Sequence, residues 1–434
     1  MKPLAILILS TVAFGGEPDW PQIEKHALEF LQQYVRIASV NPPADTRAPA
    51  ALFQSELEKN GLAPRLYPSG PNGQTNLVVR LKGRDSSKKP LLLLNHFDVV
   101  PVDAKAWNID PFGAILRDGY IWGRGTLDMK GIGVQQLTAL LALHAAGLAP
   151  TRDIVMLSTC DEESGGERGI QWMIANHYGD IESEYVLDEG GMGTREVLAP
   201  GKLVYGISVG DKVILWLRLR AQGTSGHGSQ PVPDNANIIL LEAIRKALAL
   251  PENSKPNPAV EEMRRMIGGP LAQNKFTSAI QRNTISLTTL QAGVKVNVIP
   301  STSEATLDCR LLPGVNADEF LSEMKARIND RRVTIETINA APDVGMSPSN
   351  TPLFGAMRAA ILKREPRAVV TPMLVPFGTD SAYLQKRGVI AYGFTPMILD
   401  AATAGTMHSD QERLPVAEFL KGIRIYYDVL ASGF

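Results

Sequence analysis

The sequence has few cysteines and almost no net charge, which argues against a disulfide-rich protein and against a nucleic-acid-binding protein. Only two cysteines occur in 434 residues, too few for a disulfide scaffold. Cys160 and Cys309 both lie in apolar, strand-like runs, so we expect two buried free thiols. The formal net charge is −1, which leaves no basic excess for nucleic acid or an anionic membrane face. With 44% hydrophobic and 21% charged residues, the chain can form two or more compact domains.

The N-terminal apolar run is too short to cross a bilayer, which needs roughly 20 apolar residues. MKPLAILILSTVAFGG has one lysine, then an apolar run of about a dozen residues that ends in small residues, the layout of a secretory signal. We therefore predict a signal peptide over residues 1–16, cleaved near Phe14 to Gly16, and a periplasmic or extracellular protein. An uncleaved anchor is the alternative.

Hydrophobic periodicity predicts an α/β main domain. Residues 21–40 and 49–60 have helical spacing, and 131–147 is an apolar helix that ends at a glycine. Four short runs contain consecutive apolar residues, as in strands buried on both faces. They are NLVVRLKG, PLLLLNHFD, DIVMLSTCDEE and YVLDEGG. The pattern predicts strand-helix-strand crossovers and a mixed sheet flanked by helices.

The hydrophobic pattern of the sequence changes after about residue 212. Alternating strands with turn signals, one helical run near 235–250, and a stretch rich in proline and charge at 251–265 predict an α+β insertion over 213–338. Strand and helix patterns of the first kind return afterwards. We therefore expect a metal-binding catalytic domain from 17–212 and 339–434, with 213–338 as an inserted lid or dimerisation domain.

Polar clusters follow the predicted buried strands and point to one shared site. HFDVVP, GRGTLDMKG, CDEESGG and VLDEGG each come just after a strand pattern, and MHSDQERLP lies far downstream. In an open α/β sheet, ligand sites form outside the carboxyl ends of the strands. Histidines and acids that converge there are typical of a two-metal hydrolase. The GRG tripeptide lacks the third glycine of a dinucleotide-binding fingerprint, so we interpret it as a tight turn that directs Asp128.

The ordered motifs resemble a known family. HFDVVP, GRGTLDMKG, DEESGG, LDEGG, GHGSQP, NVIP and MHSDQERLP are similar, in this order, to motifs of the M20 metallopeptidases. That family includes aminoacylase, carboxypeptidase and desuccinylase relatives. The wording GRGTLDMKG and the stretch NTISLTTLQAGVKVNVIP most resemble the branch with secreted N-acyl-amino-acid hydrolases and carboxypeptidase S. The resemblance implies a zinc-peptidase-like fold.

The residue types fit two Zn²⁺ ions, although Co²⁺ or Mn²⁺ use the same ligands. We expect His96 and His408 to bind one metal each, Asp128 to bridge the metals, and Glu163 to be a terminal ligand. A water or hydroxide between the metals would be the nucleophile. The last ligand is either Asp188 or Glu189, because members of the resembled family use either acid at this place.

Two further acids have expected catalytic roles. Asp98 lies two residues after His96, so on a strand both side chains share a face and the carboxylate can orient the imidazole. Direct ligation by Asp98 is the alternative. Glu162 precedes Glu163 and would point away from it, toward the nucleophilic water, as general base and then general acid. A solvated charge is the alternative for Glu162.

Residues of the predicted insertion are expected to complete the site. The resemblance implies that His227, in TSGHGSQP, donates to the oxyanion, often from a partner subunit, although its local sequence also fits a rigid turn. A substrate carboxylate needs a cation and amide donors. The candidates for binding it are Asn297, Arg310, Gly378, Thr379 and Asp380.

These observations predict a di-zinc hydrolase that cleaves the amide bond of an N-acyl amino acid or small peptide with a free carboxylate. A carboxypeptidase or dipeptidase is the alternative activity. A non-catalytic relative should lack ligands or the base, whereas all are present here. A serine hydrolase is a third option. Its usual local signature is a G-x-S-x-G elbow, which we expect this chain to lack. The expected partners are a small substrate and a second copy of the chain, with no nucleic acid and no stable membrane span.

Overall fold

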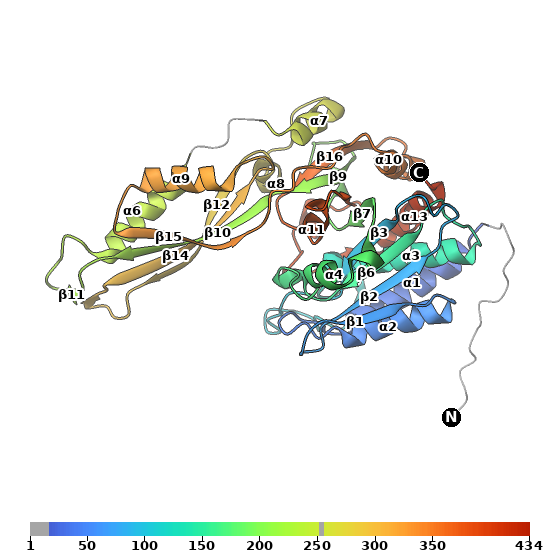
Figure 1. Ribbon diagram of the computed structural model, residues 1–434, viewed down its shortest axis with the longest axis horizontal. Helices are drawn as coiled ribbons and strands as arrows, with labels where there is room; N and C mark the ends of the chain where they lie inside the picture. Colours follow the sequence, from blue (N-terminus) through green and yellow to red (C-terminus); the bar gives the residue numbers. More distant parts are fainter. Residues whose placement is uncertain (1–16, 251–255) are drawn as a thin grey trace.

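The computed structural model describes residues 17–250 and 256–434. Figure 1 shows a main domain, built around a large sheet, and an elongated insertion domain that extends from it. The predicted signal peptide, residues 1–16, lies outside the described residues. None of the described helices combines the length and the apolar character that a membrane crossing requires.

The main domain contains a nine-stranded mixed sheet, as the sequence predicted. Strand β3 lies between β6 and β7 and runs parallel to both, whereas β2 is antiparallel to β6. The order along the sheet is β1-β2-β6-β3-β7-β17-β9-β16, with β8 paired to β9. The strands are β1 (Arg65–Pro68), β2 (Thr75–Leu81), β3 (Leu91–His96), β6 (Ile154–Thr159), β7 (Tyr185–Asp188), β8 (Met192–Thr194), β9 (Val204–Asp211), β16 (Val369–Val375) and β17 (Ile390–Gly393).

Helices cover both faces of this sheet because its central strands are apolar on both sides. Leu91 and Leu93 of β3 belong to the larger core, while Leu92 and Leu94 point to a second core on the opposite face. The larger core includes α1 (Trp20–Val35), α2 (Arg47–Lys59), α3 (Gly131–Ala145), α10 (Pro352–Arg364) and α13 (Val416–Ser432). The second core includes α4 (Ile170–Asn176), α5 (Tyr178–Ile181) and α11 (Ser381–Gln385). Cys160 and Cys309 are buried free thiols, as expected.

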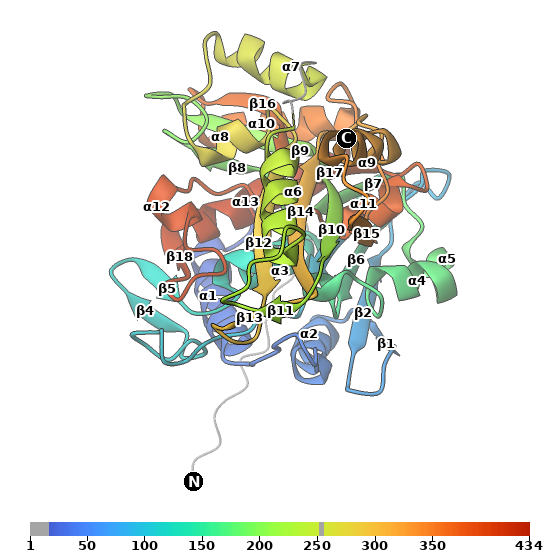
Figure 2. The ribbon, with the colours of Figure 1, turned by 90° about the vertical axis from the view of Figure 1, so that its left-hand side faces the viewer.

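The insertion domain is an antiparallel sheet with helices on one face. Strand β10 alternates buried with more exposed residues, and its buried face packs against α6 and α9. Figure 2 shows α6 lying in front of this sheet. The strand order is β12 (Thr284–Ala292), β14 (Thr302–Leu311), β10 (Val213–Gln222) and β15 (Val333–Ala340), with helices α6 (Ala236–Leu248) and α9 (Ala317–Ile328). A short ribbon of β11 (Gly226–His227) and β13 (Val298–Ile299) lies at the end farthest from the main domain (Figure 1).

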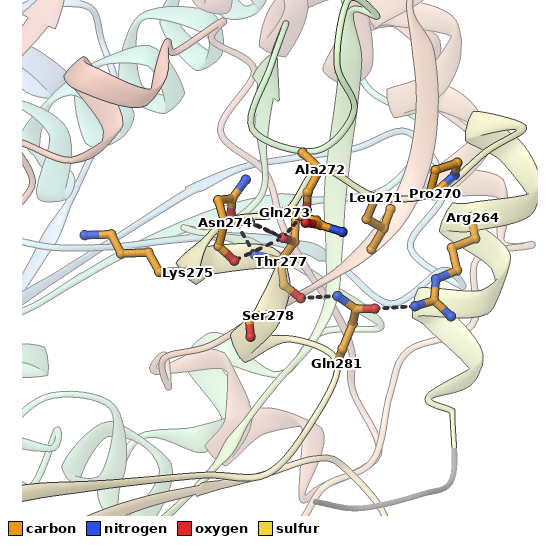
Figure 3. A pocket seen from close by; sticks show the side chains of 10 residues that line it. All are labelled: Arg264, Pro270, Leu271, Ala272, Gln273, Asn274, Lys275, Thr277, Ser278 and Gln281. Atoms are coloured by element: carbon orange, nitrogen blue, oxygen red, sulfur yellow. Dashed lines mark hydrogen bonds between the residues drawn. The ribbon is translucent and has the colours of Figure 1, made fainter.

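One part of the predicted insertion packs elsewhere. Helix α7 (Pro258–Ile267), followed by α8 (Lys275–Ala279), lies against β16 of the main domain. The charge-rich stretch near 251–265 concealed this helix, in which Val260 and Met263 face the large core. A separate cavity of about 620 Å³ lies between α7 and α8 (Figure 3). No predicted metal ligand lines this cavity.

Candidate metal centre

His96 enters the site at the carboxyl end of β3, and Asp98 fixes its surroundings. The imidazole Nδ1 lies 3.0 Å from the backbone oxygen of Asp98 and 3.5 Å from its Oδ1. The Asp98 carboxylate accepts hydrogen bonds from Asn41 Nδ2 at 2.7 Å and from the backbone N–H groups of Glu162 and Glu163 at 3.3 and 3.2 Å. These contacts suit an orienting role for Asp98 and leave Nε2 of His96 facing the site.

Asp128 lies between two imidazoles. Its Oδ1 is 3.1 Å from His96 Nε2, and its Oδ2 is 2.9 Å from His408 Nε2. Asp128 does not follow a strand of the main sheet, contrary to the predicted pattern. It lies in an irregular turn (η1, Thr126–Lys130) after β5 (Tyr120–Trp122), which belongs to a three-stranded sheet with β4 (Ile115–Arg117) and β18 (Arg413–Pro415).

His408 also comes from outside the main sheet. It lies in the loop between the short helix α12 (Ala401–Ala404) and β18. Its backbone φ is +62°, a left-handed conformation that is uncommon for a residue with a side chain. Such strain costs on the order of 1–3 kcal/mol and persists only where the surroundings enforce it.

Three glutamates complete the cluster. Glu162 and Glu163 begin the turn η2 (Glu162–Ser164) after β6, and Glu189 follows β7. Glu163 Oε1 is 3.6 Å from His408 Nε2, and Glu189 Oε1 is 3.7 Å from His96 Nε2. Glu162 Oε2 lies 4.0 Å from His96 Nε2. The carboxylate of Asp188 instead accepts hydrogen bonds from the backbone N–H groups of Glu189 and Ser381.

The acids are held in a strongly perturbed electrostatic environment. Burial, followed by the neighbouring charge of Glu189, raises the pKa of Glu162 well above its usual value. Burial and the charge of Asp128 raise the pKa of Glu163 and Glu189 as well. Burial would also raise the pKa of Asp128, but hydrogen bonds from His408 and His96 outweigh it and lower that pKa. Several buried carboxylates therefore lie close together, and the two histidines do not supply enough positive charge to keep all of them ionised.

This arrangement fits divalent cations. Among the described residues, His96 forms one possible metal-binding group with Asp128 and Glu163, and another with Glu162 and Glu189. Within residues 17–250 and 256–434, the buried Oε1 of Glu163 has no hydrogen-bond partner. Buried polar atoms normally have a partner, and a bound metal ion would provide one here. Imidazole and carboxylate donors suit Zn²⁺, Co²⁺ and Mn²⁺.

The structure does not bring the predicted residues of the insertion domain to this cluster. His227 is exposed in the terminal ribbon, where its Nδ1 accepts hydrogen bonds from the backbone N–H and the hydroxyl of Ser229. Asn297 lies in the same ribbon and accepts a hydrogen bond from Gly228 N. Arg310, on β14, pairs with Asp308 at 2.7 Å.

The predicted turn at Gly378, Thr379 and Asp380 supports buried acids. Thr379 donates to Asp211 through its backbone N–H at 2.8 Å and its hydroxyl at 2.7 Å. The Asp380 carboxylate accepts a hydrogen bond from Thr159 Oγ1. Gly378 lies beside the start of the insertion domain, where an added Cβ would be 3.0 Å from Ile214 Cδ1. The side chains of Thr379 and Asp380 are thus already engaged by Asp211 and Thr159.

The expectation that the chain holds no G-x-S-x-G sequence is wrong. Residues 206–210 read GISVG. They lie inside β9, where Ser208 is buried and its hydroxyl donates to the backbone oxygen of Gly210. A nucleophile elbow requires a sharp turn from strand to helix that exposes the serine. Ser208 therefore does not form one.

Sequence reasoning missed Asn41 and Glu412, which support the ligands. Asn41 links the carboxylate of Asp98 to the hydroxyl of Ser164. Glu412 is fully buried and contacts the backbone of the Asp128 turn. Its only signal in the sequence was its place in the motif MHSDQERLP, four residues after His408.

Comparison with known proteins gives consistent results. Residues 92–432 match the peptidase family M20/M25/M40. Aminoacylase-1B of Rattus norvegicus is 30% identical over 419 residues, covering 95% of this chain and 96% of that protein. The probable carboxypeptidase S-like 2 of Dictyostelium discoideum is 30% identical over 390 residues, covering 82% and 74%. The structure is similar, with a TM-score of 0.73 and 18% identity, to an M20 family metallo-carboxypeptidase from Sulfolobus solfataricus, covering 93% of this chain and 98% of that one.

Proposed function

Since the chain belongs to the M20/M25/M40 peptidase family, a family of metal-dependent hydrolases, we propose that it is a two-metal hydrolase of N-acyl amino acids. His96, Asp128 and Glu189 would hold one ion, and His408, Asp128 and Glu163 the other. Zn²⁺ is the proposed metal because of the mixed imidazole and carboxylate donors. When bound, two such ions polarise a substrate carbonyl and lower the pKa of a water molecule.

The observation that carries this proposal is the position of Glu162 beside the ligand set. Its carboxylate lies 4.0 Å from His96 Nε2, and its pKa is raised by burial. Glu162 would accept a proton from the attacking water and then deliver it to the leaving nitrogen, so that the amide C–N bond breaks. Asp98 would keep His96 and the backbone of the Glu162–Glu163 turn in place during the reaction.

We propose that the substrate carries a free carboxylate, recognised by residues of the insertion domain. Arg310 already donates through Nε and Nη2 to Asp308, and it would exchange this partner for a two-point contact with the substrate carboxylate. His227 lies in β11, at the far end of the insertion domain (Figure 1), and the backbone of Asn297 pairs with neighbouring Gly228. Both residues would reach the metals of a partner subunit. The preference for acyl amino acids over dipeptides rests on the aminoacylase relative, which covers 95% of this chain.

A homodimer through the insertion domain is part of this proposal. Strand β12 is an edge of its sheet, and Leu287 and Leu290 on it are 40% and 49% exposed. Ile238 and Leu241 of the nearby helix α6 are 62% and 53% exposed. An apolar surface beside an unpaired strand edge favours association with another chain. A second copy of this edge and helix would cover them symmetrically.

A substrate panel tests the proposed activity. The full-length protein, loaded with Zn²⁺, would be offered N-acetyl and long-chain acyl amino acids, dipeptides, and acyl amino acid amides that lack the free carboxylate. We expect the highest kcat/KM for an acyl amino acid and a large loss for its amide counterpart. Dipeptides as the best substrates would instead support a dipeptidase or carboxypeptidase. No hydrolysis of any member would contradict the proposed function.

A further inference from the structure

We propose that the buried pair Arg124–Glu412 is a positioning device that sets the metal affinity of the His408 side of the centre. The inference rests on the proposed two-metal function. The pair would affect the metal position formed by His408 and Glu163 more than the one formed by His96 and Glu189.

Glu412 collects four donors from the loop that carries Asp128. Its Oε2 accepts from Arg124 Nη1 at 2.6 Å and from Gly125 N at 3.0 Å. Its Oε1 accepts from Leu127 N at 2.9 Å and from Asp128 N at 3.3 Å. The Glu412 side chain is 0% exposed and that of Arg124 is 4% exposed. Because no water competes for these contacts, the carboxylate fixes the backbone of the turn that directs Asp128.

Arg124 extends the same network to the second ligand loop. Its Nη2 donates to the backbone oxygen of His408 at 3.1 Å, and its guanidinium lies 5.4 Å from the centre of the Trp107 ring. His408 has the uncommon φ of +62°, so its loop needs outside contacts to stay in this conformation. The guanidinium thus supports both the carboxylate beneath Asp128 and the strained backbone of His408.

The network is asymmetric with respect to the two metal positions. His408 contacts Asp128 and Glu163, whereas His96 is held separately by β3 and by Asp98. Loss of the pair would release the His408 loop and loosen Asp128, but it would leave His96 at the end of β3 and Glu189 just after β7. The His408 position should therefore weaken more than the other one.

Co²⁺ titration of the metal-free protein, followed by absorption spectroscopy, measures both positions. We expect two binding steps in the wild-type protein and loss of one step in His408→Ala, which identifies the His408 position. Glu412→Gln keeps the side-chain size but replaces one acceptor by a donor. We expect it to weaken the His408 step by about 10- to 100-fold, the usual effect of removing a partner that orients a ligand, and to change the other step by a smaller factor.

A control variant removes an arginine–glutamate pair of the same length but with a more exposed glutamate, which precedes β7 at the end opposite to Glu189. Arg152 Nη1 lies 2.6 Å from Glu184 Oε2, so Glu184→Gln should leave both Co²⁺ steps unchanged. If Glu412→Gln fails to fold, as judged by thermal melting, Arg124→Lys replaces it, because a lysine lacks the planar pair of nitrogens with which Arg124 contacts Glu412 and the His408 oxygen at once. Both Co²⁺ steps at wild-type affinity in a folded variant would overturn the inference. Fewer than two steps in the wild-type protein would instead contradict the two-metal function.

Discussion

At the residue scale, we propose different roles for the adjacent residues Glu162 and Glu163. Glu163 faces His408, whereas Glu162 lies nearer His96. We expect Glu162→Gln to lower kcat by about 10² to 10⁴, the effect of removing a general acid or base, while metal content stays at the wild-type level. Steady-state kinetics and elemental analysis would be combined, with the exposed Glu167→Gln as control. Loss of metal from Glu162→Gln would show that this residue is a ligand and that the two roles are reversed.

A second residue-scale prediction concerns Asn41, which the sequence pattern did not reveal. Asn41→Ala removes the donor to Asp98 Oδ2 and leaves that buried carboxylate with weaker support. Glu163 N still donates to the same oxygen, so the cost is that of one lost hydrogen bond to a charged group, about 1.5–3 kcal/mol. We therefore expect a lower melting temperature and weaker metal binding. Calorimetry of the metal-free and metal-loaded protein measures both effects. A variant with wild-type melting in both forms would show that Asn41 does not support Asp98.

At the scale of elements, the sequence predicted the main sheet well because its central strands are short, apolar runs. The predicted helix at 131–147 corresponds to α3, Gly131–Ala145. Helix α7 was missed because its charged residues hid the apolar stripe of Val260, Met263 and Ile267. The motifs named the residues of the candidate metal cluster, but they did not predict the local structure that holds Asp128 and His408. The Asp128 turn and the His408 loop are irregular, and contacts distant in sequence, such as Glu412 to Leu127, position them.

The junction between the domains gives a pH-dependent prediction. Lys212 joins β9 to β10, and its Nζ donates to the backbone oxygens of Ala279 and Arg282 and to Thr284 Oγ1. Burial, with the nearby charges of Arg310 and Arg282, lowers its pKa to about 7 despite Asp308. An unfolded lysine titrates near 10.4. The unfolded chain therefore binds more protons between these values, and the contribution of Lys212 to stability rises with pH in this window.

Comparison of the wild-type protein with Lys212→Met tests this sign. The unfolding free energy of the wild type relative to the variant should increase by roughly 1–3 kcal/mol between pH 7 and pH 9.5. Denaturant unfolding at several pH values measures it. Lys246→Met, which also removes a lysine bonded to a backbone oxygen, is the control. A difference independent of pH would contradict the assigned pKa.

At the scale of the whole molecule, His227 lies in β11 at the far end of the insertion domain, so a catalytic role for it would require a second chain or a large closure. His227→Ala should lower kcat strongly with little effect on metal binding if the histidine donates to the oxyanion. A mixture of inactive His227→Ala and Glu162→Gln chains should regain some activity, because each mixed dimer would have one intact site. Proven mixed dimers without activity would place His227 in the site of its own subunit. A His227→Ala enzyme with normal turnover would make it a turn residue only.

The central claim is that the cluster around Asp128 holds two metal ions on which hydrolysis depends. The most direct test is to titrate metal-free protein with Zn²⁺ while measuring bound metal and hydrolysis of an acyl amino acid in the same samples. We predict saturation at about two ions per chain, with hydrolysis absent from the metal-free protein and rising as the ions bind. Full hydrolysis without metal, or saturation at one ion or none, would contradict the account.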